Sequence, residues 1–123
     1  MIRFINCLRK RPDVTHQKFR EYWTSEQFNQ RMDQMVELLE PRGYARNLTL
    51  QTEANERVKM MTGGSDEPYD AIIEYWWDSA ADFYGRLDTP EAVALLEQIA
   101  REDEPYLDMV KSNGFFTEGN RTS

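Results

Sequence analysis

The chain has 123 residues, a formal net charge of −7 and an aromatic content of 12%. This length suits one domain with a sizeable core, and the aromatic content argues against disorder. An acidic chain without long lysine or arginine clusters excludes nucleic acid as a partner, because phosphates attract positive charge. No apolar run approaches the ~20 residues that cross a bilayer, and the N-terminus has no signal-peptide pattern. We therefore expect a cytoplasmic protein that binds neither nucleic acid nor membranes.

Residues 2–8 predict a first strand that carries apolar side chains on both faces, which is typical of a central strand. A helix is predicted over residues 15–39, with Thr15 as the expected N-cap and Asp13 as a second candidate. Its two apolar stripes are out of phase, because Trp23 and Phe28 are five residues apart rather than three or four. We therefore expect a bend or a break close to Thr24.

Residues 44–52 predict a second strand with one polar face, which is typical of a sheet edge. The segment that follows, residues 53–68, is too long for a hairpin turn and suggests a lid over a site. The alternative is a surface loop, with a short helix over residues 53–61 and a turn over residues 63–66. Both interpretations stay open.

Residues 69–79 hold the densest apolar cluster of the chain and predict a strand that runs into a helix. Large side chains lie on both faces, with Tyr75 and Trp77 on one and Trp76 on the other. A strand that is apolar on both faces is covered on both faces. Ser79 is the predicted N-cap of the following helix, with Asp82 at the third position completing a capping box.

The remaining residues predict one more helix and one more strand. Thr89 and Pro90 have the residue types of a cap and a first helical turn. The last strand is predicted over residues 109–117, and residues 118–123 form a polar tail. Residues 1–117 then make one domain.

The element order β-α-β-β-α-β predicts an α+β, ferredoxin-like fold with a four-stranded antiparallel sheet. Two helices cover one face of such a sheet and leave the other open in a monomer. The chain is too short to supply a second layer over Trp76 or Trp77. We therefore expect a homodimer in which two sheets pair face to face as a dimeric α/β barrel.

Several segments resemble the EthD-like family of dimeric α/β-barrel proteins. The resemblance covers nearly the whole chain and rests on residues 2–13, Phe19–Trp23, Tyr69–Ser79 with Phe83, Thr89–Glu91, Leu95–Leu96 and Phe115–Glu118. These motifs are distinctive for the fold and the dimer, but they say little about the reaction. Members of the family are associated with ether degradation, polyketide cyclisation or dehydration, cofactor-free oxidation and lactone isomerisation.

The chain departs from the family at its usual acid/base. The family commonly carries a histidine, often as His-x-Pro, a turn or two after the Tyr-Trp of the first helix. Here Glu26 or Gln27 stands at that position, depending on the helix register. The only histidine, His16, lies at the start of the helix, where we expect it to be exposed.

Glu26 and Tyr75 are the candidate catalytic residues. A carboxylate in an apolar cleft has a raised pKa and can transfer protons; the alternative for Glu26 is a solvated helix acid. The Tyr75 hydroxyl can orient a carbonyl; the alternative is a core tyrosine. The resemblance places the cleft between the first helix and the sheet, where the expected substrate-binding residues are Asn6, Tyr22, Trp23, Gln27, Tyr44 and Trp77. On the opposite face Glu74 needs a partner, for which Arg3 and Arg46 are candidates.

The position of the polar pair follows from helical spacing. Trp23 lies three residues before Glu26 and four before Gln27, and such residues share a helix face. We therefore expect one of the two polar side chains to come within hydrogen-bond or one-water reach of Tyr75 or Asn6.

Three functional hypotheses remain. The first is an enzyme without metal or nucleotide cofactor that performs dehydration, cyclisation or isomerisation on a hydrophobic aromatic or polyketide-like carbonyl compound. No metal-ligand spacing, Gly-rich phosphate loop or Ser-His-Asp set suggests another chemistry. The second is a non-catalytic protein that binds a small hydrophobic ligand, which the absence of the family histidine favours. The third is a structural dimer without a ligand.

Overall fold

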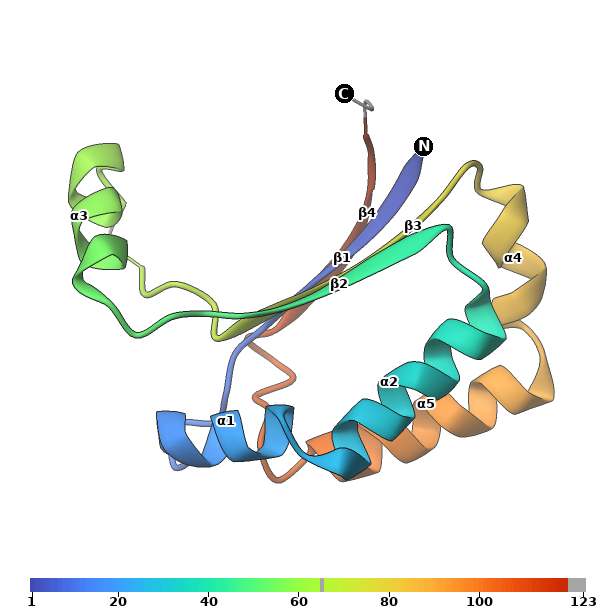
Figure 1. Ribbon diagram of the computed structural model, residues 1–123, viewed down its shortest axis with the longest axis horizontal. Helices are drawn as coiled ribbons and strands as arrows, with labels where there is room; N and C mark the ends of the chain where they lie inside the picture. The colour runs from blue at the N-terminus through green and yellow to red at the C-terminus, as the bar shows by residue number, and fades with distance from the viewer. Residues whose placement is uncertain (65, 120–123) are drawn as a thin grey trace.

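A computed structural model describes residues 1–64 and 66–119 and shows a four-stranded antiparallel sheet in the order β2-β3-β1-β4. The elements in chain order are β1 (Ile2–Leu8), α1 (His16–Trp23), α2 (Glu26–Leu39), β2 (Gly43–Leu48), α3 (Glu53–Thr62), β3 (Ala71–Trp77), α4 (Ala81–Leu87), α5 (Pro90–Asp103) and β4 (Asn113–Glu118). Helices α1, α2, α4 and α5 lie on one side of the sheet (Figure 1). This is the expected ferredoxin-like α+β architecture.

The first helical region is interrupted where the two apolar stripes change phase. Helix α1 starts after the N-cap Thr15, whose hydroxyl accepts a hydrogen bond from the Lys18 amide at 3.1 Å, and it ends at Trp23. Ser25 then caps α2 by accepting from the Phe28 amide at 3.2 Å. The expected break near Thr24 is confirmed. It lets both stripes face the same core, because each helix has its own rotation about its axis.

The two faces of β3 have different partners. Ile73, Tyr75 and Trp77 are buried towards the helices, while the intervening side chains point to the opposite side. Tyr75 pairs with Phe4 on β1 and with Tyr44 on β2, so these side chains share the helix-covered face. The core cluster thus lies between this face and the helices.

The other face of the sheet has no helix layer over it in Figure 1. Near its centre the Arg3 guanidinium lies 3.4 Å from the Glu74 carboxylate and 5.0 Å from the centre of the Trp76 ring. Arg3 is therefore the partner of Glu74. The other candidate, Arg46, pairs on the helix side with Asp33 at 2.8 Å.

Residues 53–62 form the helix α3, in agreement with the short helix expected in this segment. Thr52 caps its N-terminus, and Gly63 ends it with a φ of +74°, a conformation that favours glycine. None of its residues is buried, and Figure 1 shows it standing apart from the other helices, on the opposite side of the sheet. Ser65 of the expected turn lies outside the described residues.

Some element boundaries differ from those expected. Strand β2 ends at Leu48, because Thr52 already serves as the cap of α3. Strand β4 starts at Asn113 rather than at residue 109, because a turn closed by the Ser112 amide on the Asp108 carbonyl at 3.0 Å precedes it. It runs one residue past the expected domain end, and residues 120–123 of the expected tail lie outside the described residues.

The expected cap at Ser79 is also displaced. The N-cap of α4 is Ala80, which has no side-chain oxygen to offer. Ser79 instead donates its amide to the Asp82 carboxylate at 3.2 Å, so only the acidic half of the expected capping box forms.

Candidate functional site

Four of the expected site residues are part of the core, and three of them, Trp23, Tyr75 and Trp77, lie where the cleft was expected. The indole of Trp77 donates to the Leu39 carbonyl at 3.0 Å, and the ring of Trp23 packs on Phe28 with centroids 4.7 Å apart. The Tyr75 hydroxyl contacts the Met32 sulfur at 3.9 Å. Burial raises the pKa of Tyr75 to about 12, so this phenol stays neutral near pH 7. These side chains fill the space between α2 and the sheet where a cleft was expected.

Glu26 lies away from this region. It is exposed in the first turn of α2, and its carboxylate accepts a hydrogen bond from Gln30 at 3.3 Å. The structure therefore does not bring Glu26 and Tyr75 together. The spacing argument from Trp23 to Glu26 is wrong because the helix is interrupted between these residues, so the three-residue periodicity does not continue across the break.

Asn6 and Tyr44 border the helix-covered face without forming a shared site with Glu26. Asn6 is half-buried on β1 and pairs with Gly114 of β4. Tyr44 lies on the edge strand β2, is 46% exposed, and stacks under the guanidinium of Arg46 at 5.1 Å.

Tyr22 and Gln27 line the same pocket, at the junction of α1, α2 and the end of α5. The buried Tyr22 hydroxyl donates a hydrogen bond to the carboxylate of Asp103, a residue that is only 8% exposed. The Tyr22 ring stacks on Tyr106, with centroids 4.0 Å apart and planes 7° apart. The rings of Tyr22 and Phe28 also pack edge to face, with their centroids 5.2 Å apart. This packing fixes the phenol against the acid.

The environment of Asp103 changes its protonation. Burial raises the pKa of Asp103 to about 6; the hydrogen bond from Tyr22 opposes this rise, and the negative charge of Glu102 adds to it. Burial, together with the hydrogen bond to Asp103, raises the pKa of Tyr22 above its ordinary value, so the phenol keeps its proton. Near pH 6 the Asp103 carboxyl group therefore gains or loses one proton, while the Tyr22 phenol stays neutral.

A pocket of about 370 Å³, the helix-junction pocket, opens beside this pair and is lined by Lys18, Glu21, Tyr22, Ser25, Gln27 and Tyr106. It holds both polar and aromatic groups. At its border, hydrogen bonds from Gln27 and Arg31 outweigh the effect of burial and hold the pKa of Glu102 below its ordinary value. The Arg31–Glu102 pair, at 3.0 Å, thus remains charged beside the neutralisable Asp103. A buried acid with a perturbed pKa next to a pocket marks a candidate functional site.

Asp103 and Tyr106 are not among the site residues expected from the sequence. A signal was present, because Leu95, Ile99 and Asp103 are spaced by four residues and so lie on one stripe of α5. An aspartate on an otherwise apolar stripe needs a buried partner. Its partner, Tyr22, comes from a helix 81 residues earlier in the chain, and no local pattern identifies it.

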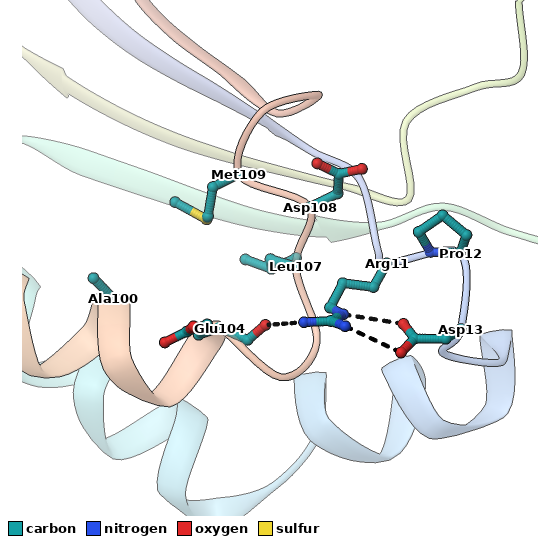
Figure 2. A pocket seen from close by; sticks show the side chains of 8 residues that line it. All are labelled: Arg11, Pro12, Asp13, Ala100, Glu104, Leu107, Asp108 and Met109. Atoms are coloured by element: carbon teal, nitrogen blue, oxygen red, sulfur yellow. Dashed lines mark hydrogen bonds and ion pairs between the residues drawn. The ribbon is translucent and has the colours of Figure 1, made fainter.

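A larger hollow, about 750 Å³, lies at the end of α5, but its arginine, Arg11, is already paired with Asp13. Figure 2 shows the Arg11 guanidinium between the Asp13 carboxylate, at 3.0 and 3.1 Å, and the Glu104 carbonyl, at 3.5 Å. This arrangement ties the loop after β1 to the end of α5. We therefore assign it a structural role.

Neither a metal cluster nor a membrane span occurs in the described part of the chain. Within residues 1–64 and 66–119, no group of three His, Cys, Asp or Glu side chains is placed to hold a metal ion. Over the same residues, no helix combines the length and apolar character needed to cross a membrane.

The fold and the helix-junction pocket define a small ferredoxin-like α+β protein with one buried acid at a pocket. The EthD domain model matches residues 11–108, and the chain belongs to the EthD family. A search of curated proteins finds no match.

Solved structures with the same fold include three from different organisms. An EthD family protein from Bacillus halodurans is 13% identical with a TM-score of 0.61, covering 98% of this chain and 100% of that one. A dimeric protein of ferredoxin-like fold from Bacteroides fragilis is 14% identical with a TM-score of 0.58, covering 96% and 95%. The hydroxynitrile lyase of Passiflora edulis is 10% identical with a TM-score of 0.55, covering 98% and 96%. At these identities the likeness shows the fold alone.

Proposed function

We propose that the protein is a metal- and nucleotide-independent enzyme that transfers protons to and from a hydrophobic aromatic or polyketide-like carbonyl compound. The reaction class is dehydration, cyclisation or isomerisation. The observation that carries this proposal is the buried Tyr22–Asp103 pair beside the helix-junction pocket. The acid is then Asp103 acting through Tyr22, rather than Glu26 or Tyr75.

The pair works as a proton relay in its protonated form. The neutral Asp103 carboxyl donates to the Tyr22 oxygen, which frees the Tyr22 hydroxyl to donate to an oxygen of the substrate. When that oxygen takes the Tyr22 proton, the Asp103 proton replaces it on Tyr22. Asp103 ends as a carboxylate, Tyr22 ends neutral, and the substrate oxygen is protonated. A pKa of about 6 populates the required acid form at mildly acidic pH.

The pocket suits an aromatic carbonyl compound. The stacked rings of Tyr22 and Tyr106 supply an aromatic wall, and Gln27 supplies an amide that can hold a carbonyl group. In a dehydration, the relay protonates the leaving hydroxyl group, the carbon–oxygen bond breaks, and water leaves. The Glu21 carboxylate, which lines the same pocket, takes the proton from the α-carbon. That a lyase of Passiflora edulis shares the fold is compatible with this chemistry.

The test is the dehydration of the benzaldehyde–acetone aldol to benzylideneacetone, followed by ultraviolet absorbance from pH 5 to 8. We expect the wild-type protein to accelerate the reaction, with a rate that falls as the pH rises through about 6. Tyr22→Phe and Asp103→Asn should each lower the rate about a hundredfold or more, the usual effect of losing a general acid. Asp88→Asn, which changes an exposed carboxylate at the end of α4, is the matched control. Equal rates for all four proteins would refute the relay.

The alternative is a non-catalytic protein that binds a small hydrophobic ligand in the same pocket. The position of the family histidine favours this alternative, because it is occupied by the exposed Glu26 or by Gln27. Gln27 can hold a carbonyl by hydrogen bonding but moves no proton. Tight binding of benzylideneacetone, without turnover of the aldol at any pH tested, would select this alternative.

We also propose that the protein is a homodimer paired through the open face of the sheet. Support comes from the apolar side chains on that face, including Ile72, Trp76 and the 41% exposed Phe115. The Bacteroides fragilis neighbour is described as dimeric with the same fold. Pairing the two open faces would bury these side chains in both copies.

A further inference from the structure

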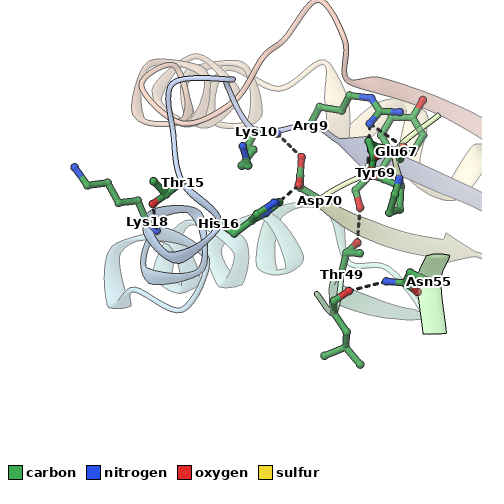
Figure 3. Close-up of polar contacts among 12 residues, drawn as sticks. Arg9, Lys10, Thr15, His16, Lys18, Thr49, Asn55, Glu67, Tyr69 and Asp70 are labelled. Carbon is green, nitrogen blue, oxygen red and sulfur yellow. Dashed lines mark hydrogen bonds and ion pairs between the residues drawn. The ribbon is translucent and has the colours of Figure 1, made fainter. Parts of the chain in front are cut away.

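The only histidine of the chain lies beside a fixed carboxylate, in a cleft separate from the helix-junction pocket. His16 is the first residue of α1, and its Nδ1 atom lies 3.7 Å from Oδ1 of Asp70, which directly precedes β3 (Figure 3). The two residues are 54 positions apart in the sequence. The chain folds them together at the end of the sheet.

Asp70 is held in place from both its backbone and its side chain. Its Oδ2 atom accepts a hydrogen bond from the Lys10 amide at 2.8 Å, and its own amide donates to the Leu8 carbonyl at 2.8 Å. The Asp70 side chain is 14% exposed, whereas that of His16 is 56% exposed. The carboxylate therefore faces one nitrogen of the imidazole and leaves the other, Nε2, for a molecule in the cleft.

The cleft is lined by both apolar and charged side chains. Its volume is about 400 Å³, and its wall includes Phe19, Leu48 and Leu50 beside His16. Arg20 lines it as well. A neighbouring groove shares His16, Asp70 and Gln51 with it, so His16 and Asp70 border both. Such a cleft suits a small molecule with an apolar body and an oxygen that becomes negative.

The hydroxyl groups that line the cleft are already engaged. Thr49 donates its hydroxyl to the Tyr69 carbonyl, and the Thr52 hydroxyl accepts from the Ala54 amide as the cap of α3. Neither is aligned as a nucleophile for His16. The imidazole is therefore arranged to act on the bound molecule directly rather than through a covalent intermediate.

We infer that the His16–Asp70 pair is a general base that removes an α-proton from an enolisable carbonyl compound bound in this cleft. Nε2 of His16 takes the proton, the electrons of the carbon–hydrogen bond move onto the carbonyl oxygen, and an enolate forms. Asp70 stabilises the imidazolium, and Arg20 stabilises the enolate oxygen. Return of a proton from Nε2 or from solvent to the same carbon restores the ketone, so the step balances without a co-reactant.

This inference takes its substrate class, a carbonyl compound, from the proposed function, but it concerns different residues and a different reaction. The charged groups that line the cleft and the neighbouring groove are Arg9, Lys10, Arg20, Glu67, Asp70, Asp108 and Lys111. Asp70 is the one that lies at contact distance from His16 in the structure. It is a positioning residue, since it acts through the imidazole.

The experiment is the exchange of the methyl protons of acetophenone for deuterium in D₂O, followed by proton NMR. We expect wild-type protein to accelerate exchange above the buffer rate and His16→Gln to lower the protein-dependent rate about a hundredfold or more. Asp70→Asn should lower kcat about tenfold or more with little change in KM, because it removes the charge behind the imidazole and leaves the cleft in place. Asp88→Asn, which changes an exposed carboxylate at the end of α4, is the matched control.

Two outcomes would overturn the inference. One is exchange no faster than in buffer. The other is a His16→Gln protein that matches wild type, which would assign exchange to other groups. Thermal unfolding of each variant checks the fold, and the exposure of His16 predicts little change there. The exchange assay compares variants of His16 and Asp70 and none of Tyr22 or Asp103. A failure of the Tyr22–Asp103 relay in the dehydration assay therefore does not decide the outcome of the exchange assay.

Discussion

The hydroxyl of Tyr22, on α1, donates a hydrogen bond to the carboxylate of Asp103, the last residue of α5, and both residues are buried. A buried carboxylate with a phenol as its side-chain partner is poorly stabilised in its charged form, because one neutral donor replaces a full hydration shell. The pair therefore places a group that titrates near pH 6 at the junction of α1, α2 and α5. Both stability and reactivity should depend on its protonation.

The stability of the protein should fall as the pH rises from about 4 to about 7 because of Asp103. The pKa of this carboxyl rises from 3.8 to about 6 on folding, so the folded state binds the proton more tightly than the unfolded state. The contribution of Asp103 to stability is then fully present below about pH 3.8 and is lost as the pH rises through about 6. The loss is of the order of 3 kcal/mol for a shift of roughly two pKa units. Asp103→Asn, which keeps an oxygen for Tyr22, should remove this part of the pH dependence in urea unfolding at pH 4 and pH 7. A variant with the same pH dependence as wild type would contradict the assignment.

Tyr22→Phe should destabilise the protein at neutral pH. The change leaves the Asp103 carboxylate buried without its phenol donor, at a cost of about 2 kcal/mol in unfolding free energy. The cost should be smaller at pH 4, where the carboxyl is neutral. Because the two side chains touch, the double variant Tyr22→Phe/Asp103→Asn should be less destabilised than the sum of the singles. Strict additivity would show that the hydrogen bond does not contribute.

Glu26→Gln should leave both stability and aldol dehydration close to wild type. The side chain is exposed and bonds only to Gln30 among the described residues, and exposed substitutions of this kind usually change stability by less than about 0.5 kcal/mol. Urea unfolding and the absorbance assay measure the two quantities. A loss of activity of about a hundredfold would restore Glu26 as the acid in place of Asp103.

Phe115→Glu should convert the proposed dimer to a monomer. The substitution places a carboxylate on the open face of the sheet, where a partner copy would bury it without a counter-charge. Light scattering at micromolar concentration measures the mass. Val93→Glu is the matched control, since Val93 is 45% exposed on α5, on the helix side of the sheet. A wild-type protein with the mass of a monomer would contradict the barrel arrangement.

Local sequence patterns were sufficient for much of the fold. Side-chain alternation in residues 69–77 identified a strand with two apolar faces, because successive side chains of a strand point to opposite sides. The five-residue interval between Trp23 and Phe28 located the helix break, since a continuous helix cannot keep both on one stripe. Thr15 and Thr89 marked helix starts because a cap is a contact between residues two or three apart.

The site was decided by tertiary structure. The orientation of Glu26 depends on the rotation of α2 after the break, and that rotation is set by core packing rather than by spacing from Trp23. The pairs Tyr22–Asp103 and His16–Asp70 join residues that are far apart in the chain, so neither partner changes the local pattern around the other. A buried acid gains its pKa from the elements that surround it, and those elements meet only when the chain has folded.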